Sequence, residues 1–229
     1  MTLCNQAHLP ILRTLLATPD VQRDTAWLSK FYAHIVDCSM TDDLPQVFFG
    51  PDHFPYFGLN LPPEDGPYKE FCIRSMLEKL TEDGVGVAIN REGLNAQWVF
   101  SYGDLLTLRM FGAVEVPAPE PGSETANRTQ GNQVLVSQPS EAYLPGYARK
   151  VIREYMQKMM GIEKPGVLLL SRPGVMPPQE LVFSVFPETF ETREIFNGAL
   201  RALRWFLPRH YGVVSVPKNS SLTQYFQPL

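Results

Sequence analysis

The stretch AINREGLNAQWVFSYGDLLTLRMFG, from Ala88 to Gly112, decides the fold of the first half of the chain. The segments on either side of the loop REGLN alternate apolar and polar side chains, which predicts a β-hairpin. Ser101 then stands where a helix N-cap is expected, and Asp104 follows three residues later, as in a capping box. The stretch therefore predicts two antiparallel strands that lead directly into a helix.

The same stretch contains candidates for a small-ligand site. Trp98 and Phe100 share one face of the second predicted strand, and Tyr102 and Arg109 follow in the helix. If that strand face is open, Trp98, Tyr102 and Arg109 line a small groove with one polar anchor. The alternative is that the aromatic rings pack into the core of the fold.

The residues before this stretch predict three helices and two short strands. Pro10 suits the first turn of a helix that runs to about Ala17, and Thr18 with Pro19 suits the start of a second helix. The segments QVFF and FPYFGLNL predict strands around a turn, and a third helix should end at Gly84. The second helix should bury the apolar residues that recur at helical spacing, which are Val21, Leu28, Phe31 and Ile35.

A change of composition divides the chain into two modules. Residues 117–132 are rich in proline, glycine and small polar residues, which is typical of a linker. Residues 1–116 before it predict an α+β module of helices and a small antiparallel sheet. Residues 133–229 predict the order β-α-β-β-α-β, which is that of a ferredoxin-like α+β module. The sequence contains no internal repeat of fixed period.

Two strands of the second module lack the alternation of apolar and polar side chains that is expected when one face of a sheet is exposed to solvent. The segments GVLLLS and ELVFSVF are apolar on both strand faces. Both faces of the predicted sheet should therefore be covered. We expect the first module, or a second copy of the chain in a homodimer, to cover the face that the helices leave open.

Composition and charge exclude several classes of protein. The chain has 229 residues, 44% of them hydrophobic, and a net charge of −4, so it can bury a core. Residues 1–131 carry 17 acidic and 9 basic side chains, whereas residues 132–229 carry 7 and 11. This small basic excess does not suit nucleic-acid binding, and the first strand of the second module lacks the aromatic residues of an RNA-binding sheet. No apolar run is long enough to span a membrane.

The cysteines allow a metal site but favour none. Cys4 with His8 and His34 with Cys38 are pairs four residues apart, which could converge on zinc. Pro10 and the order of the four residues favour ordinary histidines and buried thiols, so no metal and no cofactor is predicted. The three cysteines are an odd number at wide spacing, which predicts no disulfide framework and a cytoplasmic protein.

Two other groups have both a functional and a structural interpretation. His53 follows Asp52 in a proline-rich turn, where the pair could act as a general base or could simply cap the turn. Arg201 and Arg204 share one face of the last predicted helix, and Arg209 follows that helix. These three arginines could dock an acidic partner or could form a solvated face.

The last two fifths of the chain carry a family resemblance. It rests on the strand that leads into SQPSEAYLPG, the amphipathic helix after it, the apolar strand LVFSVF and the ending GVVSVP. In these features the chain resembles the SseB-like proteins, a bacterial family named for enhanced serine sensitivity. The resemblance implies a bacterial cytoplasmic protein and carries no catalytic residue over to this sequence.

Together these patterns predict an interaction or regulatory module that binds a protein or a small ligand without catalysis. The alternative is a small-molecule enzyme that uses the Asp52–His53 turn together with Trp98, Tyr102 and Arg109. The two hypotheses predict different structures.

An enzyme should have a pocket that joins His53 to Asp104 or Arg109. An interaction module should have a contiguous exposed apolar patch, or should leave the segment GVLLLS unpaired at the edge of its sheet.

Overall fold

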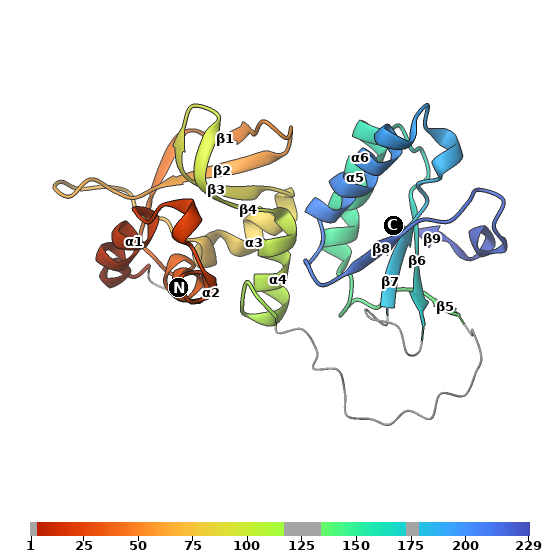
Figure 1. The fold of residues 1–229 in the computed structure, drawn as a ribbon, viewed down its shortest axis with the longest axis horizontal. Helices are drawn as coiled ribbons and strands as arrows, with labels where there is room; N and C mark the ends of the chain where they lie inside the picture. The colour runs from red at the N-terminus through yellow and green to blue at the C-terminus, as the bar shows by residue number, and fades with distance from the viewer. Residues whose placement is uncertain (1–3, 117–133, 173–178) are drawn as a thin grey trace, which may run out of the picture. The chain divides into compact units, whose positions relative to one another are not determined.

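The computed structural model describes residues 4–116, 134–172 and 179–229 (Figure 1). These residues form helices and two sheets, so the α+β class is confirmed. The chain divides into two compact units, Met1–Leu105 and Leu106–Leu229, and the division falls within helix α4 (Tyr102–Phe111). The predicted linker, residues 117–132, lies outside the described residues.

The first unit contains a four-stranded sheet with its helices on one side (Figure 1). Its elements before α4 are α1 (Leu9–Leu16), α2 (Thr25–Ile35), β1 (Thr41–Phe49), β2 (Pro55–Asn60), α3 (Ile73–Asp83), β3 (Gly86–Glu92) and β4 (Asn95–Phe100). The strands are ordered β1-β2-β3-β4. The prediction of an antiparallel sheet is wrong for one pair, because β2 and β3 are parallel. Helix α3 makes the crossover that a parallel pair requires.

The predicted hairpin and capping box are both confirmed. Strands β3 and β4 pair antiparallel, and Gly93 in their turn has φ 64°, a region that favours glycine. At the start of α4 the Asp104 amide N–H donates to Ser101 Oγ at 3.1 Å, and the Ser101 N–H donates to the Asp104 carboxylate at 2.9 Å. These reciprocal bonds satisfy donors that the start of a helix otherwise leaves without partners.

Replacing Ser101 by alanine is expected to lower the free energy of unfolding by about 1 kcal/mol, because the Asp104 amide loses its acceptor. The matched control is Ser101→Thr, which keeps a hydroxyl at the cap and should unfold close to the parent protein. Urea unfolding measures both variants. Equal stability of the alanine and threonine variants would contradict the cap.

The second helix starts later than the sequence predicts. Asp24, not Thr18, is its N-cap, and the Asp24 carboxylate accepts the Trp27 amide N–H at 2.8 Å. The Thr18 hydroxyl is engaged elsewhere, since it donates to the Thr14 carbonyl of α1 at 3.3 Å. Residues 20–22 form a 3-10 turn and Arg23 is extended, so the α-helix begins only after Asp24.

The later start changes which residues of this segment are buried. Phe31 and Ile35 are fully buried as predicted, and Leu28 is half-buried. Val21 lies before the helix, in a 3-10 turn, and is 95% exposed. The helical spacing that placed Val21 in the core therefore does not extend to it.

The second unit confirms the predicted order of elements but not the ferredoxin-like arrangement. Its elements are β5 (Leu135–Ser137), α5 (Gly146–Met160), β6 (Gly166–Ser171), β7 (Gln179–Phe183), α6 (Arg193–Trp205), β8 (Gly212–Val214) and β9 (Gln227–Pro228). The sheet order is β5-β6-β7-β8, and β9 also pairs with β6. A split βαβ unit inserts a strand between the two strands that a helix connects. Here α5 connects the neighbours β5 and β6, and α6 connects the neighbours β7 and β8.

A segment near the C-terminus covers one face of this sheet. Leu168, Leu170 and Val182 form a buried cluster against which Leu222 and Phe226 pack. Leu222 lies in the 3-10 helix η4 (Ser221–Tyr225), and Phe226 follows that helix directly. Helices α5 and α6 lie together on the opposite side of the sheet (Figure 1). The unit's own chain therefore covers this cluster, whereas the sequence predicts that the first module or a second copy does so.

The two units repeat one order of elements. In the first unit, α2 precedes the antiparallel pair β1–β2, and α3 then leads to β3, which is parallel to β2. In the second unit, α5 precedes the antiparallel pair β6–β7, and α6 leads to β8, which is parallel to β7. Each sheet also contains strands outside this shared order. In the first sheet β4 pairs with β3, whereas in the second sheet β5 and β9 pair with β6. A topological repeat thus exists where the sequence shows no fixed period.

Candidate functional site

Trp98, at the centre of the predicted groove, packs in an aromatic cluster of the first unit. Its ring centroid lies 4.9 Å from that of Phe31 and 5.5 Å from that of Trp27, and Tyr32 and Phe100 are also in ring contact. Helix α2 supplies three of these rings and β4 the other two, so the cluster joins helix to sheet. The Trp98 indole N–H is buried and meets no acceptor among the described residues, so packing alone holds the ring.

Tyr102 and Arg109 do not join Trp98 in one groove. Tyr102 is fully buried, and its hydroxyl donates to the Thr81 carbonyl at 2.9 Å, which ties α4 to α3. The Arg109 guanidinium lies 3.9 Å from the ring centroid of Tyr147, a cation–π contact. The three side chains therefore have separate partners.

Asp52 and His53 form a turn between β1 and β2. His53 is exposed, with φ 65°, and its backbone N–H donates to the Gly50 carbonyl at 2.9 Å. The Asp52 carboxylate accepts the Phe54 N–H at 3.2 Å and the Tyr56 hydroxyl at 2.6 Å. The carboxylate is thus used to cap the turn, which is the structural alternative that the sequence left open.

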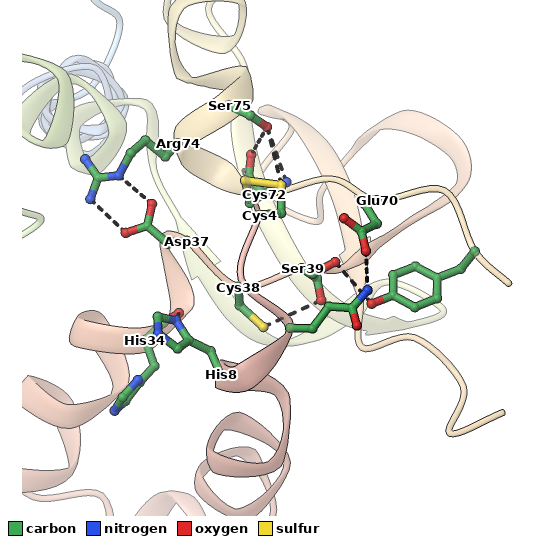
Figure 2. Close-up of a disulfide and its surroundings, with 12 residues drawn as sticks. Cys4, His8, His34, Asp37, Cys38, Ser39, Glu70, Cys72, Arg74 and Ser75 are labelled. Atoms are coloured by element: carbon green, nitrogen blue, oxygen red, sulfur yellow. Dashed lines mark hydrogen bonds and ion pairs between the residues drawn. A yellow bond between two sulfur atoms is a disulfide. The ribbon is translucent and has the colours of Figure 1, made fainter. Parts of the chain in front are cut away.

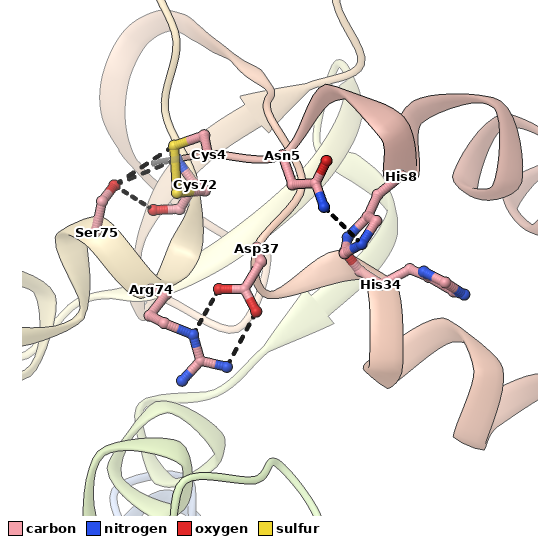
Figure 3. A network of polar contacts seen from close by, with 8 residues as sticks. All are labelled: Cys4, Asn5, His8, His34, Asp37, Cys72, Arg74 and Ser75. Atoms are coloured by element: carbon pink, nitrogen blue, oxygen red, sulfur yellow. Dashed lines mark hydrogen bonds and ion pairs between the residues drawn. A yellow bond between two sulfur atoms is a disulfide. The ribbon is translucent and has the colours of Figure 1, made fainter. Parts of the chain in front are cut away.

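The proposed zinc ligands are committed to other bonds. His8 Nδ1 donates to the His34 carbonyl at 2.9 Å, and its Nε2 accepts from the Asn5 side-chain amide at 3.1 Å (Figure 3). Cys4 is bonded to Cys72 and so offers no thiolate. Within the described ranges, no group of three or more histidine, cysteine or acidic side chains is placed to hold a metal ion. The four residues of the zinc hypothesis therefore do not form a ligand set.

The expectation of no disulfide is wrong, because Cys4 and Cys72 are bonded (Figure 2). They are separated by 68 positions in the sequence, yet their Cα atoms lie 5.6 Å apart. Backbone pairing explains this proximity, since Asn5 and Phe71 each form a β-bridge with residues 38–40. The two bridges depend on tertiary structure, which cysteine spacing does not report.

The two ends of the disulfide differ in their surroundings. Cys72 is fully buried at the N-cap of α3, whereas Cys4 is partly exposed. Ser75 Oγ lies 3.9 Å from Cys4 Sγ and donates to the Cys72 carbonyl at 2.8 Å. The Arg74 guanidinium binds the Asp37 carboxylate at 2.5 Å and 3.2 Å, which anchors the start of α3 (Figures 2 and 3).

The third cysteine is a buried thiol. Cys38 has no exposed surface, and its Sγ donates to the Ser39 carbonyl at 3.6 Å. Burial raises the pKa of the Cys38 thiol to about 12. Because the thiolate is the reactive form, this cysteine is a poor nucleophile at neutral pH.

An open cleft of about 660 Å³ lies between the two segments that the disulfide joins. Its walls include Gln6, Pro10 and Arg13 on the N-terminal side, and Glu64, Tyr68 and Glu70 in the connection between β2 and α3. Two hydrogen bonds run between these segments, from the Gln6 amide to the Glu70 carboxylate and from the Arg13 guanidinium to the Pro62 carbonyl. The volume is within the usual range of ligand sites.

Sequence reasoning missed this cleft, although one signal was present. Residues 61–72 connect β2 to α3 with neither helix nor strand, apart from the bridge at Phe71. A connection of that length inside a compact unit is often functional. Its partner wall, at the N-terminus, could not be identified from the sequence, because only the fold brings the two together.

The predicted basic surface lies in the second unit. Arg201 and Arg204 are exposed on α6. Arg209 lines a second cleft, of about 400 Å³, together with Glu115 and His210. Arg201 and Arg204 thus share a helix face as predicted, whereas Arg209 lies in the second cleft.

Comparison with protein-family models, curated proteins and solved structures finds no match for this chain. Among the described helices, none has the length and apolar character needed to cross a membrane. The function is therefore inferred from the geometry and chemistry of the surfaces described above.

Proposed function

We propose that the chain is an interaction module without catalysis, which binds an extended apolar segment of a partner protein along β1. One observation carries the proposal: Val47 and Phe49 are 49% and 68% exposed on the same face of an edge strand. Large apolar side chains grouped in this way are uncommon on monomeric proteins unless an interaction covers them.

The exposed side chains continue into a half-buried aromatic surface. Val47 stands opposite Phe57 in the β1–β2 pair, and the ring of Phe57 lies 5.9 Å from that of Phe71. We call Val47, Phe49, Phe57 and Phe71 the β1 strip. The Lys69 ammonium lies 4.8 Å from the centroid of the Phe71 ring and borders the strip with charge. An apolar centre with a polar border is the usual composition of a protein interface.

The edge of β1 supports recognition of an extended segment. Apart from the bridge at Met40, the described residues pair this strand only with β2. Its register with β2 is irregular between Asp42 and Val47, so the regular free edge is limited to Val47–Phe49. So short an edge adds few main-chain hydrogen bonds, and the side chains of the strip must supply most of the affinity.

The net acidic charge of the first unit indicates which charge the partner segment should carry. Between Met1 and Leu105 the sequence has 14 acidic and 7 basic side chains. An apolar segment flanked by basic residues would therefore associate faster and more specifically than an acidic one. The exposed Arg201 and Arg204 of α6 remain a second proposed surface, for an acidic partner.

The lining of the clefts favours this proposal over the enzyme hypothesis. Neither cleft described above is lined by His53, Asp104 or Arg109. The expectation of an unpaired GVLLLS edge is wrong, because this segment, β6, is paired on both edges, and the proposal rests instead on the exposed apolar side chains of β1. The proposed resemblance to SseB-like bacterial proteins of the cytoplasm agrees with binding, since it implies no catalytic residue.

A photoreactive benzoyl-phenylalanine at position 49, in cells that produce the chain, is expected to form an adduct of discrete mass with a partner protein. The matched control is position 94, because Leu94 is similarly exposed, at 65%, in the β3–β4 turn. The proposal predicts an adduct from position 49, loss of that adduct with Val47→Asp, and none from position 94.

Two results would contradict the proposed function. The first is the absence of any adduct from position 49, and the second is the same set of adducts from both positions. An adduct of twice the chain mass would keep the β1 strip as the interface but would assign the partner as a second copy of this chain.

A further inference from the structure

We propose that the Cys4–Cys72 disulfide is a reversible redox modification site, and that its reduction by a dithiol loosens the N-terminal strap and opens the adjoining cleft. The N-terminal strap is defined here as residues 4–8, which include the 3-10 helix η1 (Gln6–His8). The inference rests on the disulfide and the cleft, and it is independent of the β1 strip.

The two sulfurs are placed for directional attack. Cys4 is partly exposed while Cys72 is fully buried, so an incoming thiolate reaches Cys4 Sγ. The bond between the sulfurs then breaks, and Cys72 leaves as a thiolate at the N-cap of α3. A helix N-terminus stabilises a thiolate there, and a more stable thiolate is a better leaving group.

The exchange is completed by the reductant. After the first attack, Cys4 forms a mixed disulfide with the dithiol, whose second thiolate attacks its own first sulfur and releases the Cys4 thiolate. The dithiol is oxidised to a disulfide and loses two electrons. The two cysteine sulfurs accept those electrons, and the two protons of the dithiol pass to the thiolates or to solvent. Cys38 takes no part, because it is buried and stays protonated.

Few contacts hold the strap once the disulfide is broken. None of the residues of η1 is buried, so the strap contributes little to the apolar core. Its remaining bonds to the rest of the unit include those of Asn5 with the Asp37 carbonyl and the Ser39 amide, of His8 with the His34 carbonyl, and of Gln6 with Glu70. Exposed hydrogen bonds with little apolar burial mark the regions of a fold that open most easily.

The other end of the disulfide stays fixed. The ion pair of Arg74 with Asp37 and the bonds of Ser75 at the N-cap do not depend on Cys4. Reduction should therefore move the strap and not α3.

Movement of the strap changes the cleft directly. Gln6, a residue of the strap, lies in one wall, and its bond to Glu70 links that wall to the other. Cys4 precedes Gln6 by two residues and Cys72 follows Glu70 by two, so the disulfide clamps the walls at this end. Reduction removes the clamp and leaves only the hydrogen bond at this position.

The test uses the full-length oxidised protein, dithiothreitol as the dithiol, and no denaturant. Iodoacetamide should then label Cys4 and Cys72 but not Cys38, as read by mass spectrometry of peptides. Hydrogen exchange should become about tenfold faster in peptides from residues 4–13, where the Asn5 and His8 amides are hydrogen-bonded. Peptides from β3, whose Val87 and Ile89 are fully buried, should remain far slower than the strap, because they exchange only when the whole unit unfolds.

Matched variants exclude a merely structural effect. The double variant Cys4→Ser/Cys72→Ser should show the fast exchange without dithiothreitol and should not respond to it, while Cys38→Ala should respond like the parent. The proposal is overturned if the disulfide persists until denaturant is added. It is also overturned if the strap exchanges no faster than β3 in the reduced protein, since the whole unit would then be opening at once.

Discussion

Breaking the Cys4–Cys72 bond is expected to lower the free energy of unfolding of the first unit by about 2–4 kcal/mol. The bond joins positions 68 residues apart, and closing a loop of that size removes much of the conformational entropy of the unfolded chain. The measurement is a urea titration of the oxidised and the dithiothreitol-reduced protein, read by hydrogen exchange in peptides from β3 and β4. The reduced protein should unfold at lower urea and with a steeper slope, because its unfolded chain is less compact and exposes more surface.

The chain provides two internal controls for this prediction. Peptides from β6 and β7 report the second unit, which contains no cysteine and should not respond to the reductant. The Cys38→Ala variant should be less stable in both redox states but should keep the same difference between them. Identical urea midpoints for the oxidised and reduced first unit would contradict the prediction, because the bond would then constrain nothing in the unfolded state.

Short-range patterns predicted local structure well in this chain. The β3–β4 hairpin and the Ser101–Asp104 capping box depend only on residues a few positions apart, and both are present. The start of α2 was mispredicted because two residues could serve as caps. Thr18 is instead bonded back to the preceding helix, and a 3-10 turn at residues 20–22 separates it from the helix that Asp24 caps.

The candidate site depended on tertiary structure and so could not be predicted. Cys4 and Cys72 meet because Asn5 and Phe71 both pair with residues 38–40, and neither bridge has a sequence signature. The same bridges place the N-terminal strap against the connection of residues 61–72, which forms the cleft. Trp98 illustrates the converse case, since strand alternation correctly placed it with Phe100 on one face but could not say whether helix α2 covers that face.

The order of the strands could not be predicted from the sequence, but the sequence did indicate that both faces of the second sheet are buried. The apolar runs of β6 and β7 correctly indicated a sheet buried on both faces. The covering residues Leu222 and Phe226 lie in a short polar segment without helical or strand periodicity, so nothing marked them as core. Periodicity identifies a regular element that buries a face, but not an irregular segment that does so.

Replacing Leu222 and Phe226 together by alanine is expected to lower the free energy of unfolding of the second unit by about 3 kcal/mol. Both side chains are half-buried and pack on the cluster that contains Leu168, Leu170 and Val182. Their removal exposes apolar surface of β6 and β7 and leaves space in the contact that remains. Urea titration with hydrogen exchange in β6 and β7 peptides measures the loss, and β3 peptides should be unchanged.

Tyr225→Ala is the matched control, because Tyr225 lies in the same segment but its side chain is half exposed. Its carbonyl accepts the Gln138 side-chain amide, and that backbone bond survives the substitution, so the variant should stay within about 0.5 kcal/mol of the parent. If the double variant is as stable as Tyr225→Ala, some other part of the protein or a second copy must cover the sheet. A large loss confined to the second unit means that residues 216–226 are the cover, and that a dimer is not needed to bury this face.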